Sequence, residues 1–467
     1  MVTPRREALL TVGFIDNYCQ AYQNLFSDVR NYEAFKLLHL GMLSEIPRKS
    51  LTKIARAVGL KDSQGLNHFL SEAHWSVEKV REIRLWLTKL FIGEREVTLC
   101  LDETGDAKKG KTTDYVAKQY IGNLGKTKNG IVSVNAYAVV EGITYPLLFK
   151  IFKPRKRLKV EDTYKTKPQL AIEIIKELRK WNFNIKLVLA DSLYGKSGDV
   201  ITALEQSNLE YIVAIRSNHK VWMFGKERKR YNRWKPYQQK LSRKKSETRY
   251  IREIIFGKRK HIRFYQISKK KNKNPEPKDT WFIMTNKKGK IATTIASEYS
   301  LRNWIEYAFK QVKNELGWAD FRVTDYQSIE RWWELVMSTY LLVSIQANYF
   351  QLETIVPDAN SQVSTLKPSS SFPFSNHPWW EKGNTWKSSL NNLRLIIQPL
   401  IFCHFIKPLL SVFPNQYLQL GLSKLINSMN RFRASPFSPS QRLLRRKTTE
   451  PALTVGQSVE SLLSVAC

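Results

Sequence analysis

The alternation of short apolar runs and helical segments between residues 96 and 216 is the feature that most limits how this chain can fold. Three β-rich runs come first, separated by glycines and polar turns: VTLCLD from Val97, IVSVNAYAVVEG from Ile131 and ITYPLLFKIF from Ile143. A helical segment at 167–181, a strand at 185–190, a helix at 198–206 and a strand at 211–215 follow them. The order β-β-β-α-β-α-β predicts an α/β fold.

This order is that of the ribonuclease H-like fold, whose sheet carries carboxylates at strand ends. Here Asp102 ends the first predicted strand, Asp191 ends the fourth, and Glu306 lies on a predicted helix further along. Three carboxylates at one point repel each other unless divalent cations neutralise them, and paired magnesium ions activate an attacking oxygen and stabilise a leaving one. The pattern indicates phosphodiester chemistry. The alternative, that Asp102 and Asp191 are only turn or cap residues, is less persuasive for two such residues at strand ends in this order.

The charge of the chain narrows the class of partner. Lys and Arg total 76 against 41 Asp and Glu, a net charge of +35. That imbalance excludes an ordinary enzyme of small neutral metabolites and predicts a polyanionic partner, most plausibly nucleic acid.

Nearly half of this charge lies in residues 217–279, which hold 22 basic residues against 5 acidic ones. Aromatic residues, Trp222 and Trp234 among them, are interleaved with the basic ones, a composition suited to gripping phosphates and stacking on bases. We interpret the stretch as a basic β-rich insert that serves as a DNA surface. A solvated basic insert with a small β core is the alternative.

The remaining segments are predicted to be helical. Residues 1–95 are predicted to form a helical N-terminal DNA-binding domain, in which Ser50 to Leu70 has a helix-turn-helix outline. The outline is equally compatible with an ordinary helical hairpin. The catalytic core takes residues 96–216 and 280–326, a helical C-terminal region takes 327–432, and 433–467 form a mobile tail.

Neither export nor membrane insertion is expected. The N-terminus has no apolar signal segment, and the four cysteines have no CxxC spacing, which argues against a disulfide framework and for a reducing, cytoplasmic location. The most apolar late stretch, Leu395 to Phe413, is interrupted by Pro399, Lys407 and Pro408. We therefore expect a buried helical hairpin there and no membrane span.

A rival chemistry is offered by GDAKKGKT at Gly105 to Thr112, which matches the phosphate-loop pattern G-x4-G-K-T after a predicted strand. Asp191 would then be available as a magnesium-binding acid, and the chain would be a nucleotide-driven DNA motor. Against this, a phosphate loop must open a helix, and the residues after Thr112 have poor helical periodicity.

The helix that carries Glu306 shows the sharpest pattern. At 100° per residue from Tyr299, the side chains of Arg302, Glu306 and Lys313 project with it from one 60° stripe. An apolar stripe that includes Ile305 and Val312 lies beside it. A helix buried on one side would thus present a hydroxyl, a guanidinium, a carboxylate and an ammonium group in a row.

The spacing Tyr299-x2-Arg302-x3-Glu306-x6-Lys313 resembles the Tyr-Arg-Glu-Lys signature of bacterial insertion-sequence transposases of the DDE superfamily, in the branch with a β-strand insert before the catalytic Glu. The resemblance extends to LCLDETGDAKKGKTTDYVAKQYIGNLGKT, to LVLADSLYG and to the strand TWFIMTN, and covers roughly residues 97–326.

The resemblance implies an enzyme that cuts double-stranded DNA at element ends and joins the freed 3′ hydroxyls to target DNA, acting as a homodimer. Asp102, Asp191 and Glu306 would hold two Mg²⁺ ions, for which Mn²⁺ can substitute. Tyr299, Arg302 and Lys313 would contact phosphates near the cut, and Trp222 or Trp234 would stack on a displaced base. The acids Glu103, Asp106 and Glu141 fall outside the signature and are left as structural or supporting residues. A non-catalytic DNA-binding regulator derived from a transposase stays a second alternative.

Overall fold

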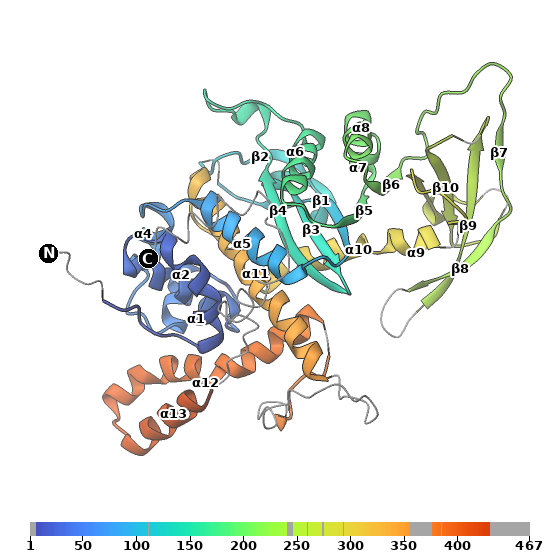
Figure 1. The fold of residues 1–467 in the computed structure, drawn as a ribbon. Helices are drawn as coiled ribbons and strands as arrows, with labels where there is room; N and C mark the ends of the chain where they lie inside the picture. The colour runs from blue at the N-terminus through green and yellow to red at the C-terminus, as the bar shows by residue number, and fades with distance from the viewer. Residues whose placement is uncertain are drawn as a thin grey trace, which may run out of the picture. The chain divides into compact units, whose positions relative to one another are not determined.

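A computed structural model describes residues 6–110, 112–240, 246–258, 260–272, 275–292, 294–354, 376–383 and 385–429. The chain divides into two compact units. The first takes residues up to Arg84, Glu315–Arg322 and the chain from Gln327 on; the second takes Leu85–Asn314 and Val323–Tyr326. Figure 1 shows the elements of both units.

The first unit is helical. Its helices are α1 (Gly13–Cys19), α2 (Val29–Leu43), α3 (Leu51–Ala57), α4 (Gln64–Ser71), the first half of α5 (Val77–Ile92), nearly all of α11 (Tyr326–Thr354), α12 (Trp386–Val412) and α13 (Gln416–Met429), with a short 3-10 turn η1 (Gln20–Leu25). A helical N-terminal region was predicted, and among its described residues no strand occurs before Val97.

The helix-turn-helix outline forms as two short helices. Ser50 and Ser63 are the N-cap residues of α3 and α4, and Gly59 lies between these helices at φ +80°. A side chain at this φ would be strained, so glycine suits the turn that separates the two helices. Whether this pair of helices contacts DNA stays a prediction.

The second unit is built on one mixed sheet of eleven strands. They are β1 (Val97–Ala107), β2 (Ala117–Ile121), β3 (Lys126–Val140), β4 (Ile143–Ile151), β5 (Ile185–Ala190), β6 (Glu210–Ile215), β7 (Lys229–Tyr231), β8 (Lys235–Lys240), β9 (Ser246–Phe256), β10 (Arg263–Ser268) and β11 (Thr280–Thr285). The unit's helices are α6 (Lys167–Lys180), α7 (Ser192–Gly195), α8 (Gly198–Gln206), α9 (Thr294–Ser300) and α10 (Asn303–Asn314), with 3-10 turns η2 (Gly122–Leu124), η3 (Arg155–Arg157) and η4 (Pro277–Asp279).

The predicted order of strands and helices is confirmed in a mixed α/β sheet. Strand β3 pairs antiparallel with β1 and β4, whereas β1, β5 and β6 run parallel to one another. The one strand in this part that was not predicted is β2, which forms a hairpin with β3. Its half-polar sequence, AKQYI, explains why the apolar pattern missed it.

The strands of the basic insert continue this sheet. Strand β11 pairs with β6 on one side and with β10 on the other, and β9 pairs with β10, β7 and β8. The insert therefore belongs to the same compact unit as the strands that carry Asp102 and Asp191. The domain boundaries proposed from the sequence stay a prediction.

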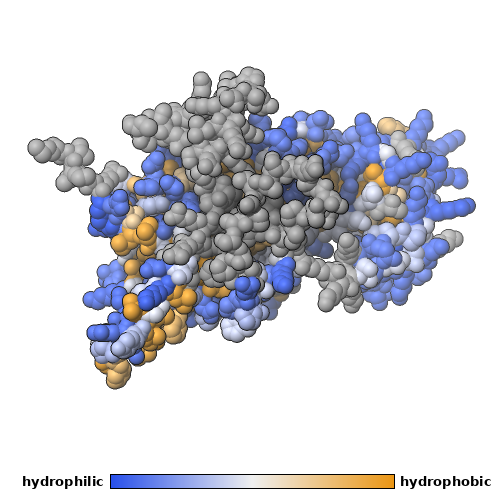
Figure 2. All heavy atoms as spheres, turned by 60° about the horizontal axis from the view of Figure 1, so that its bottom comes forward, coloured by the Kyte–Doolittle hydropathy of each residue, from blue (hydrophilic) through white to orange (hydrophobic). Residues whose placement is uncertain are grey.

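The expectation of a buried helical hairpin at Leu395 to Phe413 is wrong. Helix α12 runs unbroken through this stretch, with Pro399 and Pro408 inside it, and its buried side chains lie between Trp386 and Ile397. Beyond them, apolar side chains such as Phe402 and Phe413 are half or more exposed, and Figure 2 shows apolar surface over α12 and α13. Hydropathy reports that residues are apolar but not what covers them. By length and composition α12 could cross a membrane; the absence of a membrane partner stays a prediction.

Candidate active site

Two of the predicted acids meet where the parallel pairing of β1 with β5 ends. Leu101 of β1 is in register with Ala190 of β5, so the residues that follow them, Asp102 and Asp191, lie side by side. Asp191 directly follows β5 as predicted, but the prediction that Asp102 ends its strand is wrong, because β1 continues to Ala107 through its pairing with β3. One carboxylate oxygen from each of Asp102, Glu103 and Asp191 lies within 4.8 Å of the others. Carboxylate oxygens at such spacing are the ligands that Mg²⁺ and Mn²⁺ prefer, so this donor set fits a divalent cation.

Glu103 is the acid that the sequence analysis did not assign to the site. It falls outside the Tyr-Arg-Glu-Lys signature and was therefore predicted to be a structural or supporting residue. In the structure the Glu103 carboxylate approaches Lys167 Nζ at 3.3 Å and accepts a hydrogen bond from the Tyr194 hydroxyl at 3.3 Å. Its position directly after Asp102 was the signal for it in the sequence.

Glu306 is not part of this cluster but is connected to it by Arg302. One guanidinium nitrogen of Arg302 lies 2.9 Å from Asp102 Oδ2, and the other lies 2.6 Å from Glu306 Oε1. The structure thus brings Asp102, Arg302 and Glu306 together in one chain of ion pairs. Glu306 itself is about half exposed.

The four residues of the Tyr-Arg-Glu-Lys signature do not lie on one continuous helix. The prediction that they project from one stripe of a single helix is therefore wrong. Tyr299 lies on α9, Arg302 lies in the break before α10, and Glu306 and Lys313 lie on α10. The Ser300 hydroxyl donates to the Ser297 carbonyl near the end of α9. Around the break the backbone bonds join residues three apart, as in Arg302 N–H to the Tyr299 carbonyl at 3.0 Å, so the turn is tightened there.

Lys313 also contacts strand β1. Its Nζ lies 2.9 Å from Asp106 Oδ1 and donates to the Gly105 carbonyl at 2.7 Å. Asp106 thus pairs with a signature residue, and its structural or supporting role stays a prediction. Glu141 pairs with Arg95 at 2.9 Å, away from the cluster.

Burial makes the acid cluster electrostatically costly. Burial raises the pKa of Asp102 to about 8, the charge of Arg302 opposes this rise, and the nearby Asp191 and Glu103 carboxylates add to it. Burial likewise raises the pKa of Glu103, against the charge of Lys167. Two neighbouring carboxylates whose burial opposes ionisation are stabilised in their charged form by a divalent cation.

The two tryptophans proposed to stack on bases differ in their surroundings. Trp222 is 79% exposed. Trp234 is only partly exposed: its indole donates to the Asn272 carbonyl, and the Arg252 guanidinium lies 4.3 Å from its ring centroid. Trp222 is thus the better placed of the two for contact with a base.

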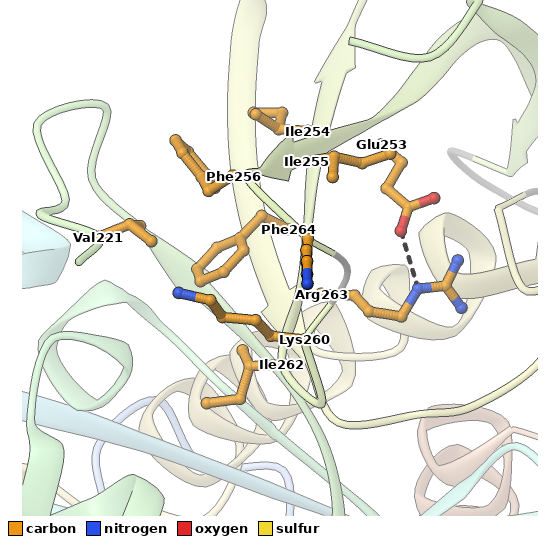
Figure 3. Close-up of a pocket in the computed structure, with 10 residues that line it drawn as sticks. Val221, Glu253, Ile254, Ile255, Phe256, Lys260, Ile262, Arg263 and Phe264 are labelled. Atoms are coloured by element: carbon orange, nitrogen blue, oxygen red, sulfur yellow. Dashed lines mark hydrogen bonds and ion pairs between the residues drawn. The ribbon is translucent and has the colours of Figure 1, made fainter. Parts of the chain in front are cut away.

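The insert contains a small hollow, and one of the residues that line it is Val221, the chain neighbour of Trp222. Figure 3 shows its lining, in which Phe256 and Phe264 face Lys260 and the Arg263 side chain reaches Glu253. None of the lining residues belongs to the acid cluster. Figure 2 shows that hydrophilic side chains cover most of the insert surface in that view.

The phosphate-loop interpretation is not supported by the backbone. Gly105 to Ala107 belong to β1, and the described residues from Thr112 to Val116 form bends and turns that lead into β2. No helix begins there among the described residues, which leave out Lys111. A phosphate loop needs a helix N-terminus at this point.

Comparison with known proteins identifies the class. Residues 23–265 match the family model described as DDE superfamily endonuclease. The chain is also 48% identical over 358 residues to the "Probable transposase for insertion sequence element IS701" of Microchaete diplosiphon; this alignment covers 75% of the chain and 93% of that relative. The chain therefore belongs to the DDE superfamily of endonucleases and is a transposase of that superfamily.

The family match covers part of the site. It includes Asp102 and Asp191 and ends before Tyr299. DDE enzymes use divalent metals, and a transposase binds DNA. A catalytic role for Glu306, which lies beyond the matched residues, stays a prediction.

Proposed function

We propose that this transposase cuts DNA at the ends of an insertion sequence and joins the freed 3′ hydroxyls to target DNA, using Asp102, Asp191 and Glu306 as its catalytic acids. The observation that carries the proposal is the meeting of Asp102 and Asp191 on two parallel neighbouring strands, where their pairing ends. The strand order β4-β3-β1-β5-β6 supports the finer assignment of a ribonuclease H-like core.

Bound divalent cations, two Mg²⁺ or Mn²⁺ ions, would activate the attacking oxygen and stabilise the leaving oxygen. Asp102 on β1 and Asp191 directly after β5 would hold them, and Glu306 would reach them from α10. Lys167 and Tyr194 hold the Glu103 carboxylate in place. Glu103 would in turn add negative charge to the cluster and help to orient the metal ligands. The spacing of Tyr299, Arg302, Glu306 and Lys313 supports membership of the Tyr-Arg-Glu-Lys branch.

The insert would hold DNA beside the acids. Its charge attracts phosphates, and the exposed Trp222 offers a ring to an unpaired base. We further propose that two copies act together on the two element ends, in the bacterial cytoplasm and at the nucleoid when bound to DNA.

A nicking assay tests the function directly. With DNA that carries the element ends, the purified protein is expected to nick in Mg²⁺ or Mn²⁺ without nucleotide and to stop when EDTA removes the metal. Gel analysis of labelled strands measures the nicks. An absolute requirement for ATP would favour the motor, and binding without nicking in either metal would favour the regulator.

The contribution of the insert is measured by the salt dependence of DNA binding. Lys220, Lys226 and Arg228 are exposed and flank Trp222. Replacing all three with Gln is expected to make the slope of log affinity against log salt shallower by up to roughly 0.9 per lost phosphate contact. Point substitutions are preferable to deletion, because β9 and β10 belong to the main sheet.

A triple variant of the exposed Lys176, Arg179 and Lys180 on α6 removes the same charge and is the matched control. It should keep the wild-type slope. Equal slopes for both variants would show that the charge of the insert is merely solvated.

A further inference from the structure

Arg302 engages two of the proposed catalytic acids at once. Its two terminal nitrogens contact Asp102 Oδ2 and Glu306 Oε1 at 2.9 and 2.6 Å. The other oxygen of Asp102, Oδ1, accepts a hydrogen bond from the Glu103 backbone N–H at 2.9 Å. Each of the two carboxylate oxygens of Asp102 therefore has a partner within the protein.

This arrangement competes with metal binding. A Mg²⁺ ion binds carboxylate oxygens at about 2.0–2.1 Å and requires near-ideal geometry. A guanidinium that contacts the same oxygens repels the metal cation and blocks its access to them. A metal ion shared by Asp102 and Glu306 thus requires Arg302 to leave.

The location of Arg302 allows such a movement. It lies in the two-residue break between α9 and α10, where backbone hydrogen bonds join residues that are three apart in the chain. Its side chain is 19% exposed, so it remains accessible from the surface. A DNA phosphate offers the guanidinium the same paired oxygen acceptors that it now finds on two carboxylates.

We propose that the Arg302 guanidinium occupies the metal position between Asp102 and Glu306. A DNA phosphate then binds the guanidinium and draws it away from these two acids, which leaves their oxygens to the metal. Arg302 is then a positioning residue that couples DNA binding to metal binding. This inference rests on the proposed function, because it takes Asp102 and Glu306 as metal ligands. Since coupling is reciprocal, the metal must also strengthen DNA binding.

Isothermal titration with Mn²⁺ as the probe tests this proposal without using activity. The full-length protein is titrated alone and in complex with an end-containing duplex, and titration of the duplex alone is subtracted. For wild type, DNA is expected to tighten Mn²⁺ binding about tenfold. Arg302→Gln alone is expected to bind Mn²⁺ about as tightly as the wild-type complex, with little further gain from DNA.

Lys310→Gln is the charge-matched control. Lys310 is exposed on α10, and the contact described for its side chain is with the Tyr307 ring. It should behave as wild type. Arg302→Lys keeps the charge but lacks the fork that reaches both acids, so its metal affinity without DNA should lie between those of wild type and Arg302→Gln. An unchanged melting temperature shows that each variant is folded.

The proposal is overturned if Arg302→Gln binds Mn²⁺ no better than wild type in the absence of DNA, or if Lys310→Gln gains as much. If wild type nicks DNA while either result holds, the coupling is wrong and the proposed function stands. If wild type neither nicks DNA nor binds Mn²⁺ with or without the duplex, both are wrong.

Discussion

Asp102→Asn and Asp191→Asn are each expected to reduce metal-dependent nicking by roughly a thousandfold or more, because a shared metal site fails as a unit. Asn keeps the shape of the side chain but removes the charge that holds the cation. The double variant should be hardly worse than either single variant, since each loss already disables the same site. DNA binding, measured by fluorescence anisotropy, should persist or tighten.

The third acid is decided by a pair of substitutions in the same assay. Glu306→Gln is expected to lose nicking as severely as the two aspartate variants, whereas Glu103→Gln should lose about tenfold, as for a residue that supports the ligands. The two changes are chemically identical, so each controls for the other. If Glu306→Gln nicks DNA nearly as well as wild type while Glu103→Gln is inactive, the third catalytic acid is Glu103 and not Glu306. Glu103 already lies in the cluster.

Glu334→Gln is expected to destabilise the helical unit by about 3–5 kcal/mol, the usual cost of leaving a buried charge without its partner. Glu334 on α11 and Arg84 on α5 form an ion pair in which both side chains are fully buried. Arg81 adds a second contact to Glu334 at 3.2 Å and pairs with Glu330 at 2.7 Å. Urea unfolding followed by circular dichroism measures the loss.

Two further variants identify the cause of that loss. Arg30→Gln breaks the exposed pair with Asp28 and should cost less than about 1 kcal/mol. The double variant Arg84→Met and Glu334→Leu removes both buried charges and should recover much of the stability lost in Glu334→Gln. If Glu334→Gln costs no more than Arg30→Gln, the buried pair does not stabilise the unit.

Much of the catalytic unit could be predicted because its signals are local. Strand β5 and helix α8 have the predicted bounds, since alternation and helical periodicity are properties of a few consecutive residues. Asp191 directly follows β5 as predicted, and it meets Asp102 because β1 and β5 are parallel neighbours whose pairing ends just before these two residues.

The sequence by itself determined the order of strands and helices, the basic insert and the two acids Asp102 and Asp191. Only the tertiary structure decided that Glu103 joins those acids, that Arg302 bridges Asp102 to Glu306, that the insert extends the main sheet, and that the second half of α12 stays exposed. Each of these depends on groups far apart in the chain. Asp102 and Arg302 are 200 residues apart. Periodicity reports which residues are apolar or charged along one element, whereas the partner that each finds is set by long-range packing.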